Sequence, residues 1–154
     1  MLKLPVDHAT LTALIPHAGS MSLLDSVEQA DAQSIVCTAT SHTQPNHPMR
    51  VGSRLGAVAA IEYAAQAMAL HSAWLKSQQN GQPSPASSGF LTSVRSIHCN
   101  EPWLDDLPNP LRIEAHCFAH DSNTAIYNFA VHHDDQVVVQ GRLSALLDAS
   151  HLAV

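Results

Sequence analysis

Two side chains in this sequence, those of His17 and Glu62, are suited to moving protons. His17 follows a proline in "LIPHAGSMSLLDSV" (14–27) and precedes an Ala-Gly-Ser triplet, so a turn is expected to present its ring. An imidazole has an ordinary pKa of about 6.5 and exchanges protons readily at neutral pH. Glu62 is the only formally charged residue from Leu55 to Leu75. Burying a carboxylate in so apolar a stretch costs free energy, unless the group is paired with a cation, reached by water or kept for a chemical role.

Both residues also have ordinary interpretations. Glu62 can lie on a solvated edge of a helix or accept hydrogen bonds from the loop before it, and His17 can be a surface turn or capping residue. Gln66 follows Glu62 by one helical turn, so it can orient the carboxylate or a water, or else face solvent. Asp25 is expected to be a structural residue near the start of a strand.

The element that must position Glu62 is a long helix predicted over residues 55–79. Eight alanines lie between positions 55 and 74, and proline is absent, so helix propensity is high. A helix that is apolar nearly all round is normally buried. Glu62 and Gln66 fall on one side of it and form a narrow polar strip, of the kind that lines clefts.

The rest of the chain has the composition of sheet. Two strands before the helix form a hairpin that turns near Ala32-Gln33, and a loop rich in Pro, Ser and Gly follows the helix. The predicted strands are 23–31, 34–41, 90–102, 111–120, 124–133 and 136–147, and the loop is 80–89. Strand and helix do not alternate regularly, which disfavours a parallel sheet. We therefore predict an α+β hot-dog fold, an antiparallel sheet wrapped around one central helix, with 1–154 as a single domain.

Composition excludes several classes of protein. Apolar residues make up 45% and charged residues 13%, which is too apolar for a disordered chain and leaves room for an oligomer interface. The net charge of −6 and the seven scattered basic residues disfavour a nucleic-acid partner. No apolar run is long enough for a membrane span or a signal peptide, so we expect a soluble, cytoplasmic protein.

The cysteines and histidines show no metal or disulfide pattern. Cys37, Cys99 and Cys117 are far apart and form no C-x-x-C pair, so they are expected to be small buried side chains. His132 and His133 are adjacent, and on a strand their rings would point to opposite faces. We expect no metal site.

Two motifs resemble those of the 3-hydroxyacyl-[acyl carrier protein] dehydratases, a hot-dog family. In "LIPHAGSMSLLDSV" the matching residues are Ile15-Pro16-His17, Leu24, Asp25 and Val27. In "GAVAAIEYAAQAMALH" (56–71) they are Ile61-Glu62, Ala65-Gln66 and Ala67. The resemblance spans nearly the whole chain, and the second motif is similar to the divergent dehydratase-like branch associated with aryl polyene and xanthomonadin-type pigments.

This resemblance implies a homodimer in which His17 of one protomer meets Glu62 of the other, giving two equivalent sites. His17 would act as the base at the α-carbon, and Glu62 would protonate the leaving β-hydroxyl of a 3-hydroxyacyl thioester. Backbone amides at the start of the helix would donate to the thioester oxygen. The residues expected to bind the substrate are Gly56, Ala57, Val58 and Gln66.

The resemblance also implies that the substrate arrives on the phosphopantetheine arm of an acyl carrier protein, with no other cofactor. Carrier proteins are acidic, so a basic rim is expected, supplied by Arg50, Arg54 and Arg95. The segment "NHPMRVGSRLGAV" (46–58) departs from the family's pattern, because His47-Pro48 is only a partial match to His-Phe-Pro-Gly. How the thioester is held is left open.

Two other functions stay open. A hot-dog acyl thioesterase also uses a carboxylate on the central helix, but directs a water at the thioester; the histidine paired with the glutamate favours dehydration over it. A non-catalytic hot-dog subunit would instead bind a partner enzyme or an acyl chain, and the altered segment before the helix is what keeps this alternative open.

Overall fold

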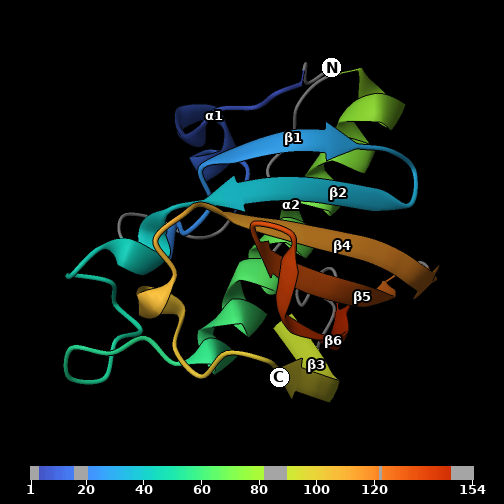
Figure 1. Cartoon of the computed structure of the whole chain (residues 1–154). Helices are drawn as coiled ribbons and strands as arrows, with labels where there is room; N and C mark the ends of the chain where they lie inside the picture. The colour runs from blue at the N-terminus through green and yellow to red at the C-terminus, as the bar shows by residue number, and fades with distance from the viewer. Residues whose placement is uncertain (1–3, 16–20, 82–89, 122, 147–154) are drawn as a thin grey trace, which may run out of the picture.

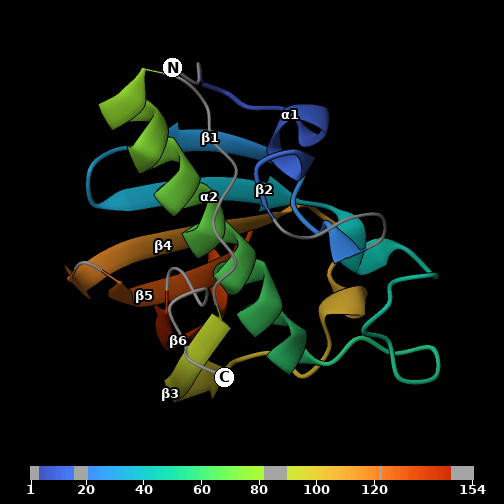
Figure 2. The ribbon, with the colours of Figure 1, turned by 180° about the vertical axis from the view of Figure 1, so that it is seen from behind.

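One antiparallel sheet and one long helix make up most of the protein (Figure 1). The computed structural model describes residues 4–15, 21–81, 90–121 and 123–146. Its strands pair in the order β1-β2-β4-β5-β6-β3. Their bounds are β1 Ser26–Ala30, β2 Ser34–Ala39, β3 Phe90–Cys99, β4 Leu111–His120, β5 Thr124–His133 and β6 Gln136–Leu146. Figure 2 shows helix α2 (Ala60–Asn80) lying across one face of this sheet, which is the predicted hot-dog arrangement.

Helix α2 begins later than predicted because tertiary contacts use the backbone before it. The amide of Leu55 donates to Asp105 Oδ1 at 2.8 Å, and the carbonyl of Leu55 accepts from Leu104 N–H at 2.9 Å. Residue 55 therefore pairs with the short 3₁₀ turn η4 (Leu104–Asp106), and another 3₁₀ turn, η3 (Ala57–Ala59), leads into α2.

The end of α2 agrees with the prediction to within one residue. Gly81 has a φ of 72°, in the left-handed region, and its N–H donates to Ser77 O at 2.9 Å, which closes the last turn. None of the helices in the described residues is long and apolar enough to cross a membrane.

The N-terminal part differs from the prediction at two points. A short helix, α1 (His8–Thr12), was not expected; Asp7 caps it by accepting the N–H of Thr10 at 2.9 Å. Strand β1 starts at Ser26 and not at 23, because the backbone of Leu23 is bound by side chains described below. The turn between β1 and β2 lies where it was predicted.

The core forms where the alanine-rich face of α2 packs against β2, β4 and β5. Fully buried alanines of the helix face larger side chains of the sheet; the core includes Ala60, Ala64, Ala67, Ile35, Ile113, Val131 and Leu143. Cys37 is buried as expected, but Cys117 is only half-buried and Cys99 is exposed, so the prediction of three buried cysteines holds fully only for Cys37. Cys99 is the last residue of the edge strand β3.

Candidate active site

Glu62 lies in the first turn of α2 and is half-buried. Gln66, one turn later, is fully buried, and its Nε2 donates to Glu62 Oε1 at 3.2 Å. The polar strip is therefore present, and the solvent-facing alternative for Gln66 is wrong. Because an amide donor holds one carboxylate oxygen, the Glu62 carboxyl has a preferred orientation.

Gln66 also binds the backbone of the segment that follows His17 in sequence. Its Nε2 donates to Met21 O at 2.7 Å, and its Oε1 accepts from Leu23 N–H at 3.0 Å. One side chain thus satisfies backbone groups of residues 21 and 23 while it contacts Glu62. His17 itself lies outside the described residues, so its pairing with Glu62 stays a prediction.

The carbonyl of Leu23 is held from the other side by a chain of side-chain hydrogen bonds. Ser41 Oγ donates to Leu23 O at 2.8 Å and lies 2.6 Å from the hydroxyl of Tyr63, which is fully buried in α2. The same Tyr63 hydroxyl lies 3.1 Å from His47 Nε2. Three segments distant in sequence, those of Leu23, of Ser41 with His47, and of Tyr63, therefore meet at this point.

His47 is a buried histidine, only 5% exposed. The N–H of Met49 donates to its Nδ1 at 3.1 Å. Burial, followed by the nearby Arg50 charge, lowers the pKa of His47, so the ring is neutral at neutral pH. Burial raises the pKa of Tyr63 to about 12, so its phenol keeps its proton.

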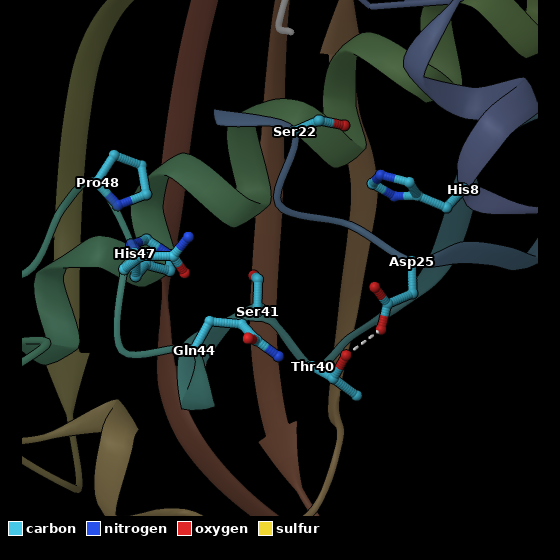
Figure 3. Close-up of a pocket in the computed structure, with 9 residues that line it drawn as sticks. His8, Ser22, Asp25, Thr40, Ser41, Gln44, His47 and Pro48 are labelled. Atoms are coloured by element: carbon cyan, nitrogen blue, oxygen red, sulfur yellow. Dashed lines mark hydrogen bonds between the residues drawn. The ribbon is translucent and has the colours of Figure 1, made fainter. Parts of the chain in front are cut away.

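Beside this network is a pocket of about 220 Å³, lined mainly by residues of polar type (Figure 3). Its lining residues are His8, Ser22, Asp25, Thr40, Ser41, Gln44, Asn46, His47 and Pro48. Thr40 Oγ1 donates to Asp25 Oδ2 at 2.7 Å, which fixes that carboxylate and agrees with a structural role for Asp25. Ser22 is 6% exposed, and within the described parts of the chain its hydroxyl has no hydrogen-bond partner. A buried unpaired hydroxyl is unfavourable unless a ligand or a water completes it.

His47 is the candidate functional residue that the sequence interpretation underrated. Its position in an Asn-His-Pro stretch ahead of the helix was the available signal, but a polar turn of this kind is usually exposed. Its burial depends on Tyr63 and Met49, which contact it only in the folded protein. A neutral imidazole held in a pocket by two defined hydrogen bonds is a suitable acid–base group.

The three amides predicted to hold the thioester oxygen differ in their surroundings. The N–H of Ala57 already donates to Pro102 O at 3.0 Å, which leaves Gly56 and Val58 for this role. Val58 is 66% exposed at the start of the helix. Gly56 has ordinary extended backbone angles, and a Cβ at this position would meet no atom within 4 Å. The space beside Gly56 is therefore open to a ligand.

The three predicted rim arginines lie in different settings. Arg50 is largely buried and donates to the carbonyls of Gln44, Ser53 and His42. Arg54 forms ion pairs of 2.9 Å with Asp105 and Asp106, and its guanidinium lies 4.5 Å from the centre of the Trp103 ring. Arg95 is exposed on β3. Asp105 and Asp106 therefore balance the charge of Arg54. Arg50 also lies 4.0 Å from Asp105, but its hydrogen bonds hold its own loop together.

Comparison with solved structures shows which proteins share this fold. The dehydratase heterocomplex ApeI:P from Xenorhabdus doucetiae is 22% identical, with a TM-score of 0.81, and the match covers 97% of this chain and 94% of that chain. A mutant of the thioesterase PA1618 from Pseudomonas aeruginosa is 11% identical, with a TM-score of 0.55 over 80% of this chain and 79% of that one. The E. coli PaaI protein of the phenylacetic acid degradation operon is 15% identical, with a TM-score of 0.52 over 80% and 77%.

At the level of sequence, no curated protein matches the chain. A family model does match it: residues 9–152 fit the model described as ApeP-like, ApeP dehydratase. The matched range contains Glu62, Gln66, His17 and His47, together with every strand of the sheet. The chain belongs to the ApeP-like dehydratase family.

Proposed function

We propose that this protein dehydrates a 3-hydroxyacyl thioester, carried on the phosphopantetheine arm of an acyl carrier protein, to the trans-2-enoyl thioester. The observation that carries the proposal is the contact of Gln66 with both Glu62 and the backbone of residues 21 and 23. This contact fixes Glu62 within a polar site of its own chain. His17 is expected from the partner protomer, so its approach to Glu62 stays part of the proposal. Membership of a dehydratase family supports the class of reaction.

In the proposed reaction His17 takes a proton from the α-carbon while Glu62 gives a proton to the β-hydroxyl. The C–O bond breaks, a C=C bond forms between the α- and β-carbons, and one water leaves. Negative charge develops on the thioester oxygen, and the amides of Gly56 and Val58 are the donors that would stabilise it. His47 is a second imidazole at this end of the helix, and it is the alternative proton-transfer group if His17 is not required.

The two histidines can be separated by single substitutions. His17→Ala should abolish turnover and leave the free energy of unfolding nearly unchanged, because the Pro-His-Ala-Gly-Ser sequence predicts a turn, where a side chain usually contributes little packing. His47→Gln should destabilise the fold as well, because the ring is buried and hydrogen-bonded on both nitrogens. Full turnover by His17→Ala together with loss of turnover in His47→Gln would transfer the catalytic role to His47.

We further propose that the protein works as part of a dimer with shared active sites. Strand β3 is an edge of the sheet, and the exposed Val94 lies on it, so its free edge can pair with another hot-dog chain. Our prediction from sequence was a homodimer. The ApeP-related solved structure is a heterocomplex, which supports a different hot-dog subunit as the partner. Mass photometry of the protein alone and of the protein with a co-expressed dehydratase subunit would distinguish the two.

The carrier protein is proposed to dock near the pocket and the start of α2. Arg95 is the exposed member of the predicted rim, but it lies on β3, at the opposite edge of the sheet from β1 and the pocket. Arg54 is nearer the start of α2 and is paired with Asp105 and Asp106. We propose an aryl polyene precursor as the acyl group, on the basis of family membership and of the ApeI:P match. This choice can be tested by comparing the turnover of one carrier protein loaded with aryl or with alkyl 3-hydroxyacyl groups of equal chain length.

Thioester hydrolysis is the second candidate reaction, because solved thioesterases share the fold. Mass spectrometry of a 3-hydroxyacyl carrier protein after incubation separates the two reactions. Loss of one water from the acyl group supports dehydration. Release of the free acid, with unacylated carrier protein left behind, would show a thioesterase. If the acyl group is unchanged with the protein alone but loses water when a second subunit is present, the chain needs a catalytic partner.

A further inference from the structure

The outer face of the sheet, which lies away from α2 and toward the viewer in Figure 1, carries two arginines side by side. Tyr127 and Phe129 of β5 are buried in the core, so Asn128 between them points to the outer face. Arg142 of β6 is the register partner of Asn128, and Arg95 of β3 is the register partner of Arg142. Paired residues of antiparallel strands point to the same side, so both arginines lie on the outer face.

Arg95 and Arg142 therefore place two positive charges opposite each other on neighbouring strands. Like charges in this position destabilise a sheet. Within their bounds, β3, β5 and β6 contain no Asp or Glu, although the whole chain has a net charge of −6. In the described part of the chain neither arginine forms an ion pair, and Glu114, on the same face of β4, is already paired with Arg112 at 3.2 Å. A bound anion would offset the repulsion between the two arginines.

Two contacts hold the guanidinium of Arg142 in one orientation. Its Nε donates to Asn128 Oδ1 at 2.9 Å, and its Cζ lies 4.4 Å from the centre of the Phe118 ring. Among the described residues this is the only hydrogen bond of the group, so the N–H groups of both terminal nitrogens remain available. A guanidinium that is already oriented loses less side-chain entropy when it binds a phosphate or a carboxylate.

Beside Arg142 is a pocket of about 390 Å³, here called the outer pocket, lined by Ser96, His98, Asn128, Phe129, Gln140, Gly141 and Arg142. The side chains of Ser96, His98 and Gln140 add a hydroxyl, an imidazole and an amide, each of which can donate a hydrogen bond. Ser96 has a φ of 55°, in the left-handed region, where the pairing of β3 is irregular between Arg95 and His98. Residues other than glycine rarely adopt this conformation, and such strain and irregular pairing are concentrated at functional sites.

We propose that the outer pocket is a binding site for a phosphate monoester. Arg142 binds the phosphate oxygens through its terminal nitrogens, and Arg95 supplies the second positive charge. Two guanidinium groups favour a dianion over the single charge of a carboxylate or a phosphodiester. The pocket is larger than one phosphate group, so it also has room for part of the molecule that carries the phosphate. Because the site is on the opposite side of the sheet from α2, its ligand does not compete with a substrate at Glu62.

Titration calorimetry of the purified protein with phenyl phosphate tests the outer pocket. At a pH of about 7.5 this probe carries roughly two negative charges, whereas diphenyl phosphate carries one and serves as the comparison. Phenyl phosphate should bind at one site per chain and raise the melting temperature, because it binds only the folded state. Diphenyl phosphate should bind at least about tenfold more weakly. Equal affinities for the two probes, or binding of neither, would overturn the proposal.

Single substitutions locate the binding site on the outer face. Arg142→Gln and Arg95→Gln should each weaken the binding of phenyl phosphate about tenfold, the effect of one hydrogen bond to a charged group. Arg112→Gln is the matched control, because Arg112 is also exposed on the outer face but is paired with Glu114, and it should bind like the wild type. Without the probe, Arg95→Gln should be at least as stable as the wild type, since it relieves the repulsion with Arg142. Equal weakening in all three variants would show a general charge effect and overturn the site.

An acidic carrier protein is the other partner that the two arginines could attract, and kinetics distinguish it from a phosphate monoester. If the outer face docked a carrier protein, Arg95→Gln and Arg142→Gln would raise KM for a carrier-bound substrate, and phenyl phosphate would not bind the wild type. That result would overturn the phosphate site. With a phosphate site, KM for the carrier-bound substrate should stay unchanged in both variants. The calorimetry needs no turnover, so failure of the proposed dehydration would leave its result intact.

Discussion

Gln66 Oε1 accepts a hydrogen bond from the backbone N–H of Leu23, with an N–O distance of 3.0 Å. This bond joins the central helix to the N-terminal segment across 43 positions of sequence. The same amide contacts Glu62, so the carboxylate and the N-terminal segment share one support. A change at Gln66 is therefore expected to affect stability and activity together.

Gln66→Ala should lower the free energy of unfolding by about 3 kcal/mol, because it leaves the N–H of Leu23 and the carbonyl of Met21 without their partner. Urea unfolding followed by circular dichroism measures this. Gln79→Ala, at an exposed position near the end of the same helix, is the control and should change stability by less than about 0.5 kcal/mol. Equal effects of the two variants would show that the hydrogen bonds of Gln66 to residues 21 and 23 do not stabilise the fold.

Glu62→Gln should leave the melting temperature nearly unchanged, because the side chain is only half-buried and the amide has the same shape. Turnover should fall by roughly 10²-fold or more, since the amide cannot transfer a proton. Steady-state kinetics with a 3-hydroxyacyl carrier protein measures the loss. Retention of wild-type kcat would exclude Glu62 from the chemistry.

Gly56→Ala should raise KM or lower kcat without destabilising the protein, because the added methyl group points into open space that a thioester is proposed to occupy. Gly141→Ala is the contrasting variant. There a Cβ would come within 2.2 Å of Ile97 Cδ1 and 3.2 Å of Phe129, so the fold itself should lose stability. If Gly56→Ala has wild-type kinetics, the thioester does not approach this residue.

Stability should fall steeply as the pH drops below about 6.5, the ordinary pKa of histidine. Burial is the largest influence on His42, His47 and His71, and it lowers the pKa of each in the folded state. The unfolded chain therefore binds protons more readily, and the free energy of unfolding rises with pH up to about 6.5 and then levels off. Each histidine contributes a slope of at most about 1.4 kcal/mol per pH unit.

Chemical denaturation across this pH range provides the test of the buried histidines. His71→Gln should give a shallower slope, because one of the three groups is removed. His120→Gln, at an exposed position, should leave the slope unchanged. A stability that does not change with acidification would show that the buried histidines are accessible to protons in the folded state.

The sequence predicted the elements better than it predicted their contacts. The alanine-rich run identified α2 and its burial, and alternation identified all six strands, because both patterns are local. The start of α2 could not be predicted, since it depends on Asp105, fifty positions from the Leu55 amide that it binds. The polar strip of Glu62 and Gln66 followed from helical spacing alone. The burial of His47 did not, because its partners Tyr63 and Met49 become neighbours only on folding.

Helix α2 has small buried side chains where the sheet has large ones, and this difference decides which core substitutions the protein can accept without moving Glu62. Ala60, Ala64 and Ala67 are fully buried, so a larger residue at these positions would push the helix away from the strands and move Glu62 with it. Substitutions at the sheet positions that face them, such as Ile35 or Ile113, change the shape of the interior while the helix stays in place. Sequence change in the strands can therefore alter the shape of the interior, while the position of Glu62 stays fixed by the small residues of the helix.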